Sequence, residues 1–138
     1  VKKTAAPDSL KGTGRVLLVD DEEVMRETGR AILEALGYEA VTAEDGNQAL
    51  VLFNQEKGRF DLIILDMIMP VMDGRQCFKA LRNLNATIPI LISSGFAEED
   101  LLAEMKSDGP TGFIRKPYHS SSLSLAIHEI MLQDAKQF

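Results

Sequence analysis

Polar side chains able to do chemistry follow four short apolar runs of this sequence. Those side chains are Asp20 and Asp21 after the run from Arg15, Asp66 after Leu62–Leu65, Ser93 and Ser94 after Ile88, and Lys116 after Gly112. Each run has the length and composition of a buried strand. Because the carboxyl ends of parallel strands meet at one edge of a sheet, we expect these side chains to converge on one crevice.

Three carboxylates in one crevice predict a bound cation. They would repel one another and raise each other's pKa unless positive charge were present. Mg²⁺ prefers hard oxygen ligands and is commonly completed by phosphate oxygens. The set Asp20, Asp21 and Asp66 therefore predicts a Mg²⁺ site beside a phosphoryl group.

The remaining polar residues fit the same chemistry. Lys116 offers a compact positive charge to a phosphoryl oxygen, and a serine hydroxyl can donate a hydrogen bond to another. One of the aspartates would act as the nucleophile and form an aspartyl-phosphate. Taken singly, an Asp-Asp pair commonly caps a helix, Lys-Pro commonly forms a solvated turn, and serines commonly end strands. Their occurrence at four strand ends of one sheet favours a functional site.

The apolar pattern supplies the elements that would position these residues. Strands are predicted over Arg15–Val19, Tyr38–Thr42, Leu62–Asp66, Ile88–Ser93 and Gly112–Arg115. Helices are predicted from Glu22 to Leu36, from Ala49 to a stop at Gly58, around Cys77, Phe78 and Leu81, around Leu101, Leu102 and Met105, and over Ser120–Gln133. Such alternation predicts an α/β fold with a parallel sheet covered by helices on both faces.

Length and composition limit the function classes. At 138 residues the chain suits one domain with a full core, and its net charge of −6 argues against non-specific nucleic-acid binding. No apolar run approaches the roughly 20 residues of a membrane span, so we expect no membrane contact. The single cysteine, Cys77, excludes an internal disulfide and indicates a reducing compartment, the cytoplasm.

Two local features complete the description of the chain. Residues 1–14 lack an apolar period and are predicted to be a linker or disordered arm, followed by one domain over residues 15–138. Gly29 lies inside the first predicted helix, where glycine costs about 1 kcal/mol relative to alanine. Close packing is the reason we expect for it.

Four sequence motifs together resemble a known family. They are Leu17–Glu22, Asp61–Gly74, Pro89–Gly95 and Lys116-Pro117, and the run Asp-Met-Ile-Met-Pro-Val-Met-Asp-Gly from Asp66 is the most specific. Over about residues 15–135 the chain resembles a receiver domain of bacterial two-component response regulators. The resemblance implies a flavodoxin-like, doubly wound parallel sheet with strand order 2-1-3-4-5 and five helices.

The resemblance also assigns roles to individual residues. It implies that Asp66 is the phospho-acceptor and that Lys116 binds the phosphoryl group. It implies that Mg²⁺ is held by Asp20, Asp21, Asp66 and the backbone carbonyl of Ile68. Ser94 is expected to be the conformational hydroxyl, because it lies five residues after Pro89 and directly before Gly95. Ser93 is the less favoured alternative.

A switch is implied as well. Phe113 takes the aromatic switch position, and because it has no hydroxyl any switching must work by packing alone. The readout, and a homodimer contact if the domain dimerises, is expected on the face made by the fourth helix, fifth strand and fifth helix. Ile68 and Phe96 flank the acceptor, and we expect them to restrict the attacking water.

The implied partner is a histidine kinase or a histidine phosphotransfer domain that donates the phosphoryl group. Ser93-Ser94-Gly95-Phe96 resembles receivers at the C-terminal end of hybrid sensor histidine kinases, and the start at Val1 suggests a piece of such a protein. A stand-alone regulator is the alternative. His119 and His128 are not convincing phospho-donors, since one follows Lys116-Pro117 in a turn and the other lies on the last helix.

Two other functions are weighed against phosphoryl acceptance. Phosphatases of the haloacid dehalogenase type also use a nucleophilic aspartate with Mg²⁺, but they need a second aspartate two residues on, where this chain has Ile68. A degenerate receiver used only for docking is disfavoured by the complete set of polar residues. A working receiver would catalyse its own phosphorylation and dephosphorylation without being a conventional enzyme.

Overall fold

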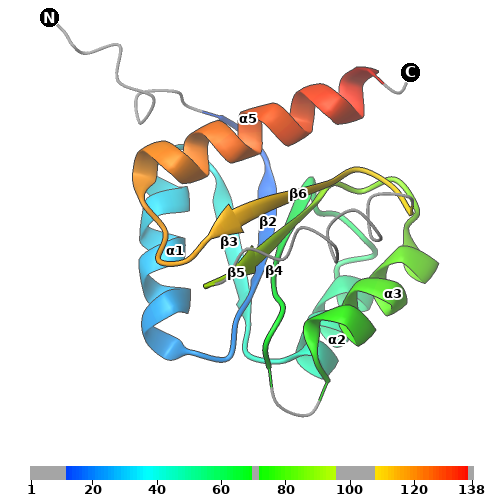
Figure 1. The fold of residues 1–138 in the computed structure, drawn as a ribbon. Helices are drawn as coiled ribbons and strands as arrows, with labels where there is room; N and C mark the ends of the chain where they lie inside the picture. The colour runs from blue at the N-terminus through cyan, green and yellow to red at the C-terminus, as the bar shows by residue number, and fades with distance from the viewer. Residues whose placement is uncertain (1–11, 70–71, 96–107, 137–138) are drawn as a thin grey trace, which may run out of the picture.

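A parallel sheet of five strands runs through the centre of the described part of the protein (Figure 1). The computed structural model describes residues 12–69, 72–95 and 108–136. The strands are β2 (Arg15–Val19), β3 (Glu39–Ala43), β4 (Leu62–Asp66), β5 (Ile90–Ser94) and β6 (Thr111–Arg115). Their order across the sheet is β3-β2-β4-β5-β6. The second strand in the chain thus lies at one edge beside the first, and the predicted order is confirmed.

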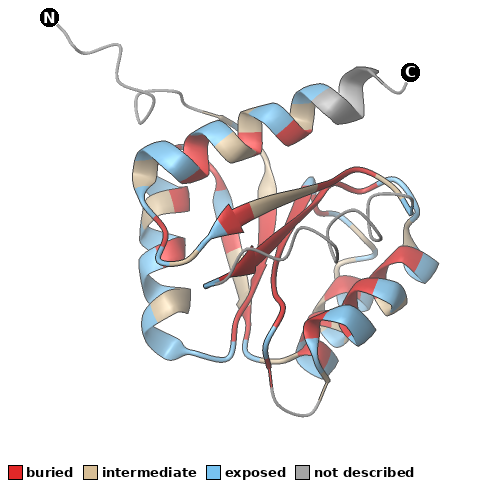
Figure 2. Cartoon of the chain, viewed as in Figure 1, coloured by how far each residue is buried: buried red, intermediate tan, exposed pale blue. Residues whose placement is uncertain are grey.

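The central strand β4 is buried along its whole length, as Figure 2 shows for the middle of the sheet. It pairs with β2 on one side and with β5 on the other. In this register Asp66 lies opposite Ser93, so the ends of β4 and β5 are level. A strand with neighbours on both sides and cores on both faces must be apolar until it ends, and β4 ends at Asp66.

Helices cover both faces of the sheet (Figure 1). On one face lie α1 (Glu23–Ala35) and α5 (Ser120–Lys136), and on the other lie α2 (Gly46–Gln55) and α3 (Gly74–Leu84). The helix predicted around Leu101, Leu102 and Met105 lies outside the described residues. Among the described helices, none combines the length and the apolar character that a membrane crossing requires.

The ends of the helices follow from local chemistry. Asp45 accepts a hydrogen bond from Gln48 N at 2.8 Å and begins α2, and Asp73 begins α3 with a capping box. The helix α2 ends at Gln55 and not at the predicted Gly58. Lys57 has φ 55° and Gly58 has φ 69°, and a right-handed helix cannot continue through such left-handed residues.

Gly29 has a packing explanation. It is buried on α1, and a Cβ there would lie 2.6 Å from Leu18 Cδ2 on β2 and 3.3 Å from the ring of Tyr118. Any side chain at this position would push the helix away from the sheet. The close approach of α1 therefore offsets the helical penalty of glycine.

Arg82 on α3 is buried at the opposite end of the sheet from Asp66. Its guanidinium donates to the main-chain oxygens of Ile88 at 2.5 Å and Pro110 at 2.6 Å. These residues precede β5 and β6, so the side chain ties α3 to the start of both strands. The guanidinium carbon also lies 5.3 Å from the centre of the Phe78 ring.

Candidate functional site

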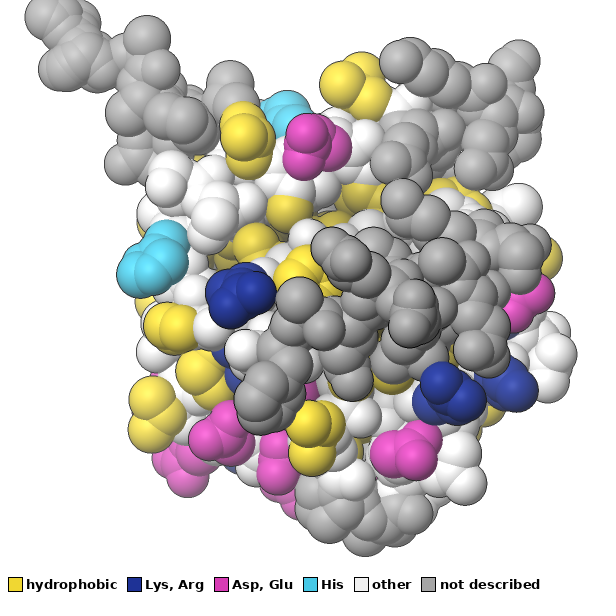
Figure 3. Space-filling model, viewed as in Figure 1, with side chains coloured by type: hydrophobic (Ala, Val, Ile, Leu, Met, Phe, Trp, Pro, Cys, Tyr) yellow, Lys and Arg dark blue, Asp and Glu magenta, His cyan; other side chains and the backbone are white. Residues whose placement is uncertain are grey.

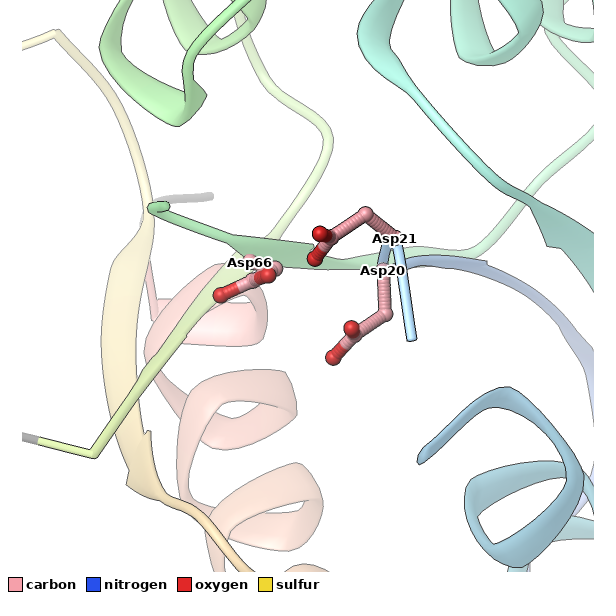
Figure 4. Close-up of side chains that lie close together, drawn as sticks. All are labelled: Asp20, Asp21 and Asp66. Carbon is pink, nitrogen blue, oxygen red and sulfur yellow. The ribbon is translucent and has the colours of Figure 1, made fainter. Parts of the chain in front are cut away.

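Three carboxylates meet where β2 and β4 end (Figure 4). Asp20 and Asp21 directly follow β2, Asp66 is the last residue of β4, and one oxygen of each lies within 4.8 Å of the others. Asp20 and Asp66 are buried, whereas Asp21 is exposed. Asp20 Oδ1 accepts a hydrogen bond from Glu22 N at 2.9 Å, so this aspartate shapes the turn rather than capping α1.

Lys116 brings a positive charge from the end of β6. Its ammonium nitrogen lies 3.0 Å from Asp20 Oδ2, 3.2 Å from Glu22 Oε1 and 3.5 Å from Asp66 Oδ1. The main-chain N–H of Lys116 donates to the carbonyl of Ser94 at 2.9 Å, which holds the ends of β6 and β5 together. The predicted convergence of side chains from four strand ends is therefore present.

Burial sets the charge state of Asp66. Burial raises the pKa of its carboxyl to about 7, the negative charge of Asp20 adds to the rise, and Lys116 and the Ile68 N–H oppose it. Burial also raises the pKa of Asp20, against the opposing effect of the Glu22 N–H and Lys116. Without added positive charge, the site thus disfavours the ionised form of both carboxylates.

The same carboxylates favour the charged form of Lys116. Burial alone would lower the pKa of Lys116, but the carboxylates of Asp20, Asp66 and Glu22 together outweigh burial and raise it. The ammonium therefore stays charged throughout the physiological range. It offers a fixed cation to any anion that enters the site.

The residues fit a divalent cation. Asp66 Oδ2 is buried and has no hydrogen-bond partner within the described part of the chain. Asp20, Asp21 and Asp66, when ionised, carry three negative charges against the one positive charge of Lys116, so two remain to be neutralised. Hard carboxylate oxygens with excess negative charge are the ligands that Mg²⁺ prefers. The expected contribution of the Ile68 carbonyl stays a prediction.

A pocket of about 560 Å³ opens above these groups. Asp66, Lys116, Ser94 and Ile68 contribute to its lining. Acidic side chains and hydrophobic ones gather together at the lower left of Figure 3, the end of the molecule at which β2 leads into α1 in Figure 1. The pocket therefore offers a nucleophilic carboxylate, a cation and a hydroxyl to one small ligand.

The structure separates the two neighbouring serines. Ser94 lines the pocket, whereas Ser93 is buried with its hydroxyl 2.9 Å from the hydroxyl of Tyr118. This placement supports Ser94 as the residue that meets the ligand. Phe113 on β6 is partly buried against the core on the α2 and α3 face. Phe96 lies outside the described residues.

Three residues near the site were not predicted from the sequence. Glu22 pairs with Lys116, and Met25 on α1 contributes to the pocket wall. Tyr118 lies buried behind the serines. Glu22 extends the Asp20-Asp21 pair and Tyr118 directly follows Lys116-Pro117, so both had a sequence signal. Nothing in the sequence distinguishes Met25 from a core residue of an amphipathic helix.

Comparisons with known proteins agree on one family. A family model described as "Response regulator receiver domain" matches residues 16–128. The sensor kinase CckA of Brucella abortus is 32% identical over 130 residues, covering 94% of this chain. The chemotaxis protein CheY of Halobacterium salinarum is 31% identical over 117 residues, covering 85% of this chain. The crystallised chemotaxis protein CheY4 of Vibrio cholerae superposes with a TM-score of 0.78 at 35% identity, covering 86% of this chain and 99% of that protein.

The relatives differ greatly in length. This chain spans 96% of the Halobacterium protein but only 14% of the Brucella sensor kinase. The matched region is thus nearly a whole protein in one relative and a small part of the other. The family model matches residues 16–128, the stretch in which all the site residues described above lie.

Proposed function

This chain belongs to the response regulator receiver domain family, and we propose that it accepts a phosphoryl group on Asp66 within a two-component phosphorelay. One observation carries the proposal. The Asp66 carboxylate is buried at the end of the central strand, 3.5 Å from the Lys116 ammonium, and it borders an open pocket. A nucleophile, a cation and acidic metal ligands in one pocket form a site for phosphoryl transfer.

The transfer step follows from these positions. A carboxylate oxygen of Asp66 attacks the phosphorus of a phosphohistidine in line with the bond to nitrogen. The new P–O bond forms as the P–N bond breaks, and the electron pair leaves with the donor imidazole, which takes up a proton. Lys116 binds one phosphoryl oxygen and the Ser94 hydroxyl donates to another. Catalysis is positioning and charge neutralisation, because the described residues that line the pocket offer no other buried carboxylate as a nucleophile.

Asp20, Asp21 and Asp66 would hold Mg²⁺, with the Ile68 carbonyl as the further ligand that the family resemblance implies. Mg²⁺, when bound, supplies the positive charge that keeps Asp66 ionised and neutralises the phosphoryl oxygens. The buried oxygen Asp66 Oδ2 supports this part of the proposal.

Phosphorylation is proposed to switch packing next to the site. Phosphate on Asp66 would draw the Ser94 hydroxyl toward it, and Phe113 on the neighbouring strand would turn inward into the space left behind. Ile92 pairs with Phe113 in the β5–β6 register, so the two events are one strand apart. Phe113 is only partly buried against the core, so an inward turn would bury more of its ring. The readout, and any homodimer contact, is proposed for the face that includes β6 and α5.

Ile68 is proposed to lengthen the lifetime of the phosphorylated state. Its side chain is 61% exposed and lies at the pocket, two residues after the acceptor. We expect Ile68→Asn to speed the loss of phosphate several-fold, since an amide would orient a water that the apolar side chain excludes. The decay of the phosphorylated mass after removal of the donor measures this rate. An unchanged decay would remove Ile68 from the proposal.

The proposed donor is a histidine kinase or a histidine phosphotransfer domain, which places the domain in the cytoplasm. The similarity to part of the sensor kinase CckA supports a receiver attached to a hybrid kinase. The near full-length match to the chemotaxis protein supports a stand-alone regulator. Both readings use the same site.

Intact mass spectrometry after incubation with acetyl phosphate and Mg²⁺ tests the proposal. We expect one added phosphoryl group, dependent on Mg²⁺ and absent from Asp66→Asn. Asp61→Asn is the matched control, because Asp61 is an exposed aspartate just before the other end of β4. No adduct on the unaltered protein would favour a docking domain, and turnover of assorted phosphate esters would favour a phosphatase.

A further inference from the structure

Two hydroxyl groups are hydrogen-bonded to each other behind the phosphorylation site. Ser93 Oγ and the Tyr118 hydroxyl lie 2.9 Å apart, and both residues are buried. Ser93 is on β5, and Tyr118 is in the turn between β6 and α5. A buried polar pair is costly unless each group satisfies the other, so the contact holds the two segments in one relative position.

The hydrogen bond joins the two segments that carry the phosphoryl-binding groups. Ser93 directly precedes Ser94, and Tyr118 follows Lys116 by two residues. The Ser93 carbonyl also accepts a hydrogen bond from the N–H of Met67 at 3.1 Å, directly after Asp66. Ser93 is therefore bonded through its main chain to the acceptor strand and through its side chain to the turn that follows Lys116.

Packing fixes the ring of Tyr118 from the other side. The ring lies over Gly29 of α1, where a Cβ would approach it to 3.3 Å. Tyr118 belongs to the core on the α1 and α5 face, together with Leu18 and Leu123. The ring thus cannot shift toward α1, and its hydroxyl is aimed at β5.

The charged groups of the site also act on the Tyr118 hydroxyl. Burial raises the pKa of Tyr118, and the charges of Asp20, Lys116 and Asp66 all act on its hydroxyl. The tyrosine therefore stays neutral at physiological pH and can serve as a hydrogen-bond donor or acceptor to Ser93.

We infer that Ser93 and Tyr118 form a positioning pair for phosphoryl transfer, setting the distance between the Ser94 hydroxyl and the Lys116 ammonium so that both meet one phosphoryl group. The inference rests on the proposed function. Neither residue touches the ligand, since Ser93 and Tyr118 do not line the pocket. They act through the segments to which they belong, and a displacement of either segment would misplace one of the two phosphoryl-binding groups.

Initial rates of phosphorylation by acetyl phosphate, with donor and Mg²⁺ each titrated, test the pair in the 138-residue chain. Tyr118→Phe and Ser93→Ala each remove one hydroxyl and little volume. We expect each to lower the rate at saturating donor and Mg²⁺ by about tenfold. The apparent Mg²⁺ affinity should stay unchanged, because Asp20, Asp21 and Asp66 are on β4 or directly after β2. The double variant should be no slower than either single variant, since both break the same bond.

Tyr38→Phe is the matched control. Tyr38 is the other tyrosine of the chain, it is buried in the same core, and it precedes β3 at the opposite end of the sheet. We expect its rate to equal that of the unaltered protein. Melting temperatures of all variants separate a rate effect from a stability effect.

The possible results are distinguishable. If the unaltered protein is phosphorylated and Tyr118→Phe and Ser93→Ala keep its rate, the positioning pair is wrong and the proposed function stands. The pair is also wrong if the phosphorylation rate of a variant falls only near its melting temperature. It is wrong as well if the rate losses of the two single variants add in the double variant. If the unaltered protein takes no phosphoryl group, the proposed function and the pair fail together.

Discussion

At the N-terminal end of the sheet the buried Arg82 donates to two main-chain oxygens, those of Ile88 and Pro110. At the C-terminal end the buried Asp20 and Asp66 face each other across Lys116, and Asp66 Oδ2 has no hydrogen-bond partner among the residues described. Both ends bury charge. At the first end two main-chain oxygens accept hydrogen bonds from the buried cation, whereas at the second end one lysine among the described residues faces three carboxylates.

The difference shows where the fold gains stability and where it gives stability up. A buried charge is tolerable when hydrogen bonds replace the water it has lost, and Arg82 meets that condition. Carboxylates gathered without enough positive charge destabilise the folded state until a ligand neutralises them. Charge that the described residues compensate only in part therefore marks the C-terminal end of the sheet as the candidate ligand-binding end.

The largest effect on stability is expected at the N-terminal end. Arg82→Met would remove the buried donor that bonds the oxygens of Ile88 and Pro110, leaving Pro110 only its bond from the Ile90 N–H, and we expect the free energy of unfolding to fall by about 3 kcal/mol. Urea denaturation measures this change. Lys79→Met is the control, since Lys79 is exposed on the same helix and its loss should change stability by less than about 0.5 kcal/mol. If both substitutions changed the free energy of unfolding equally, the buried Arg82 would not be a special source of stability at this end of the sheet.

Asp66 should make stability depend on pH in the opposite sense from an ion-paired carboxylate. Its pKa is about 7 when folded and about 3.9 when unfolded. The folded protein thus binds more protons between these values. Its free energy of unfolding should fall by about 1 to 3 kcal/mol as pH rises from about 4 to about 7. Asp66→Asn should lack this decrease of the free energy of unfolding with pH, and at pH 8 it should be more stable than the unaltered protein. Urea denaturation with a chelator present measures both, and parallel pH curves would refute the assignment.

Mg²⁺ should stabilise the folded protein by neutralising the carboxylates at the C-terminal end of the sheet. At a concentration ten times its dissociation constant it should stabilise the protein at pH 8 by about 1.4 kcal/mol. Thermal unfolding with and without Mg²⁺ measures the shift. Asp21→Asn should lose most of it, because it removes one of the three clustered carboxylates. Glu23→Gln, which removes an exposed acid two residues further along, in the first turn of α1, should keep it. The same shift in both variants would place the cation elsewhere.

The smallest effect is expected from surface charge at the N-terminal end. Arg15 pairs there with Glu39 at 2.9 Å and also with Glu56. Glu39 is exposed, so water and salt screen the pair. We expect Glu39→Gln to shift the melting temperature by no more than about 2 °C. A larger drop would mean that exposed as well as buried charges stabilise this end of the sheet.

Much of the fold and of the site could be predicted because short stretches of sequence carry the information. The run Leu62–Leu65 has the composition of a buried strand, and the position of Asp66 at its end follows from where the apolar pattern stops. The strand order follows from the resemblance of four short motifs to one family. The convergence of Asp20, Asp66 and Lys116 then follows from parallel strands sharing an edge.

Other features depended on contacts between distant residues. Arg82 meets Pro110 28 residues away, and Ser93 meets Tyr118 25 residues away. In the sequence Arg82 is only a charged residue near the end of an amphipathic helix, and Ser93 is a candidate phosphoryl-binding hydroxyl with no sign of a tyrosine partner. An apolar pattern shows which face of an element is buried, but not which side chain from another element lies against it.

The sequence by itself therefore determined the described strands and helices and the strand ends at which polar residues meet, because these depend on local patterns, and the family resemblance of its motifs added the strand order. Only the tertiary structure decided which buried polar groups are compensated. It placed Arg82 against two carbonyl groups, Ser93 against Tyr118, and Asp66 where one oxygen has no partner in the described residues. Hydrogen bonding and burial depend on distances of a few tenths of an ångström between segments, and those distances are set when the layers pack.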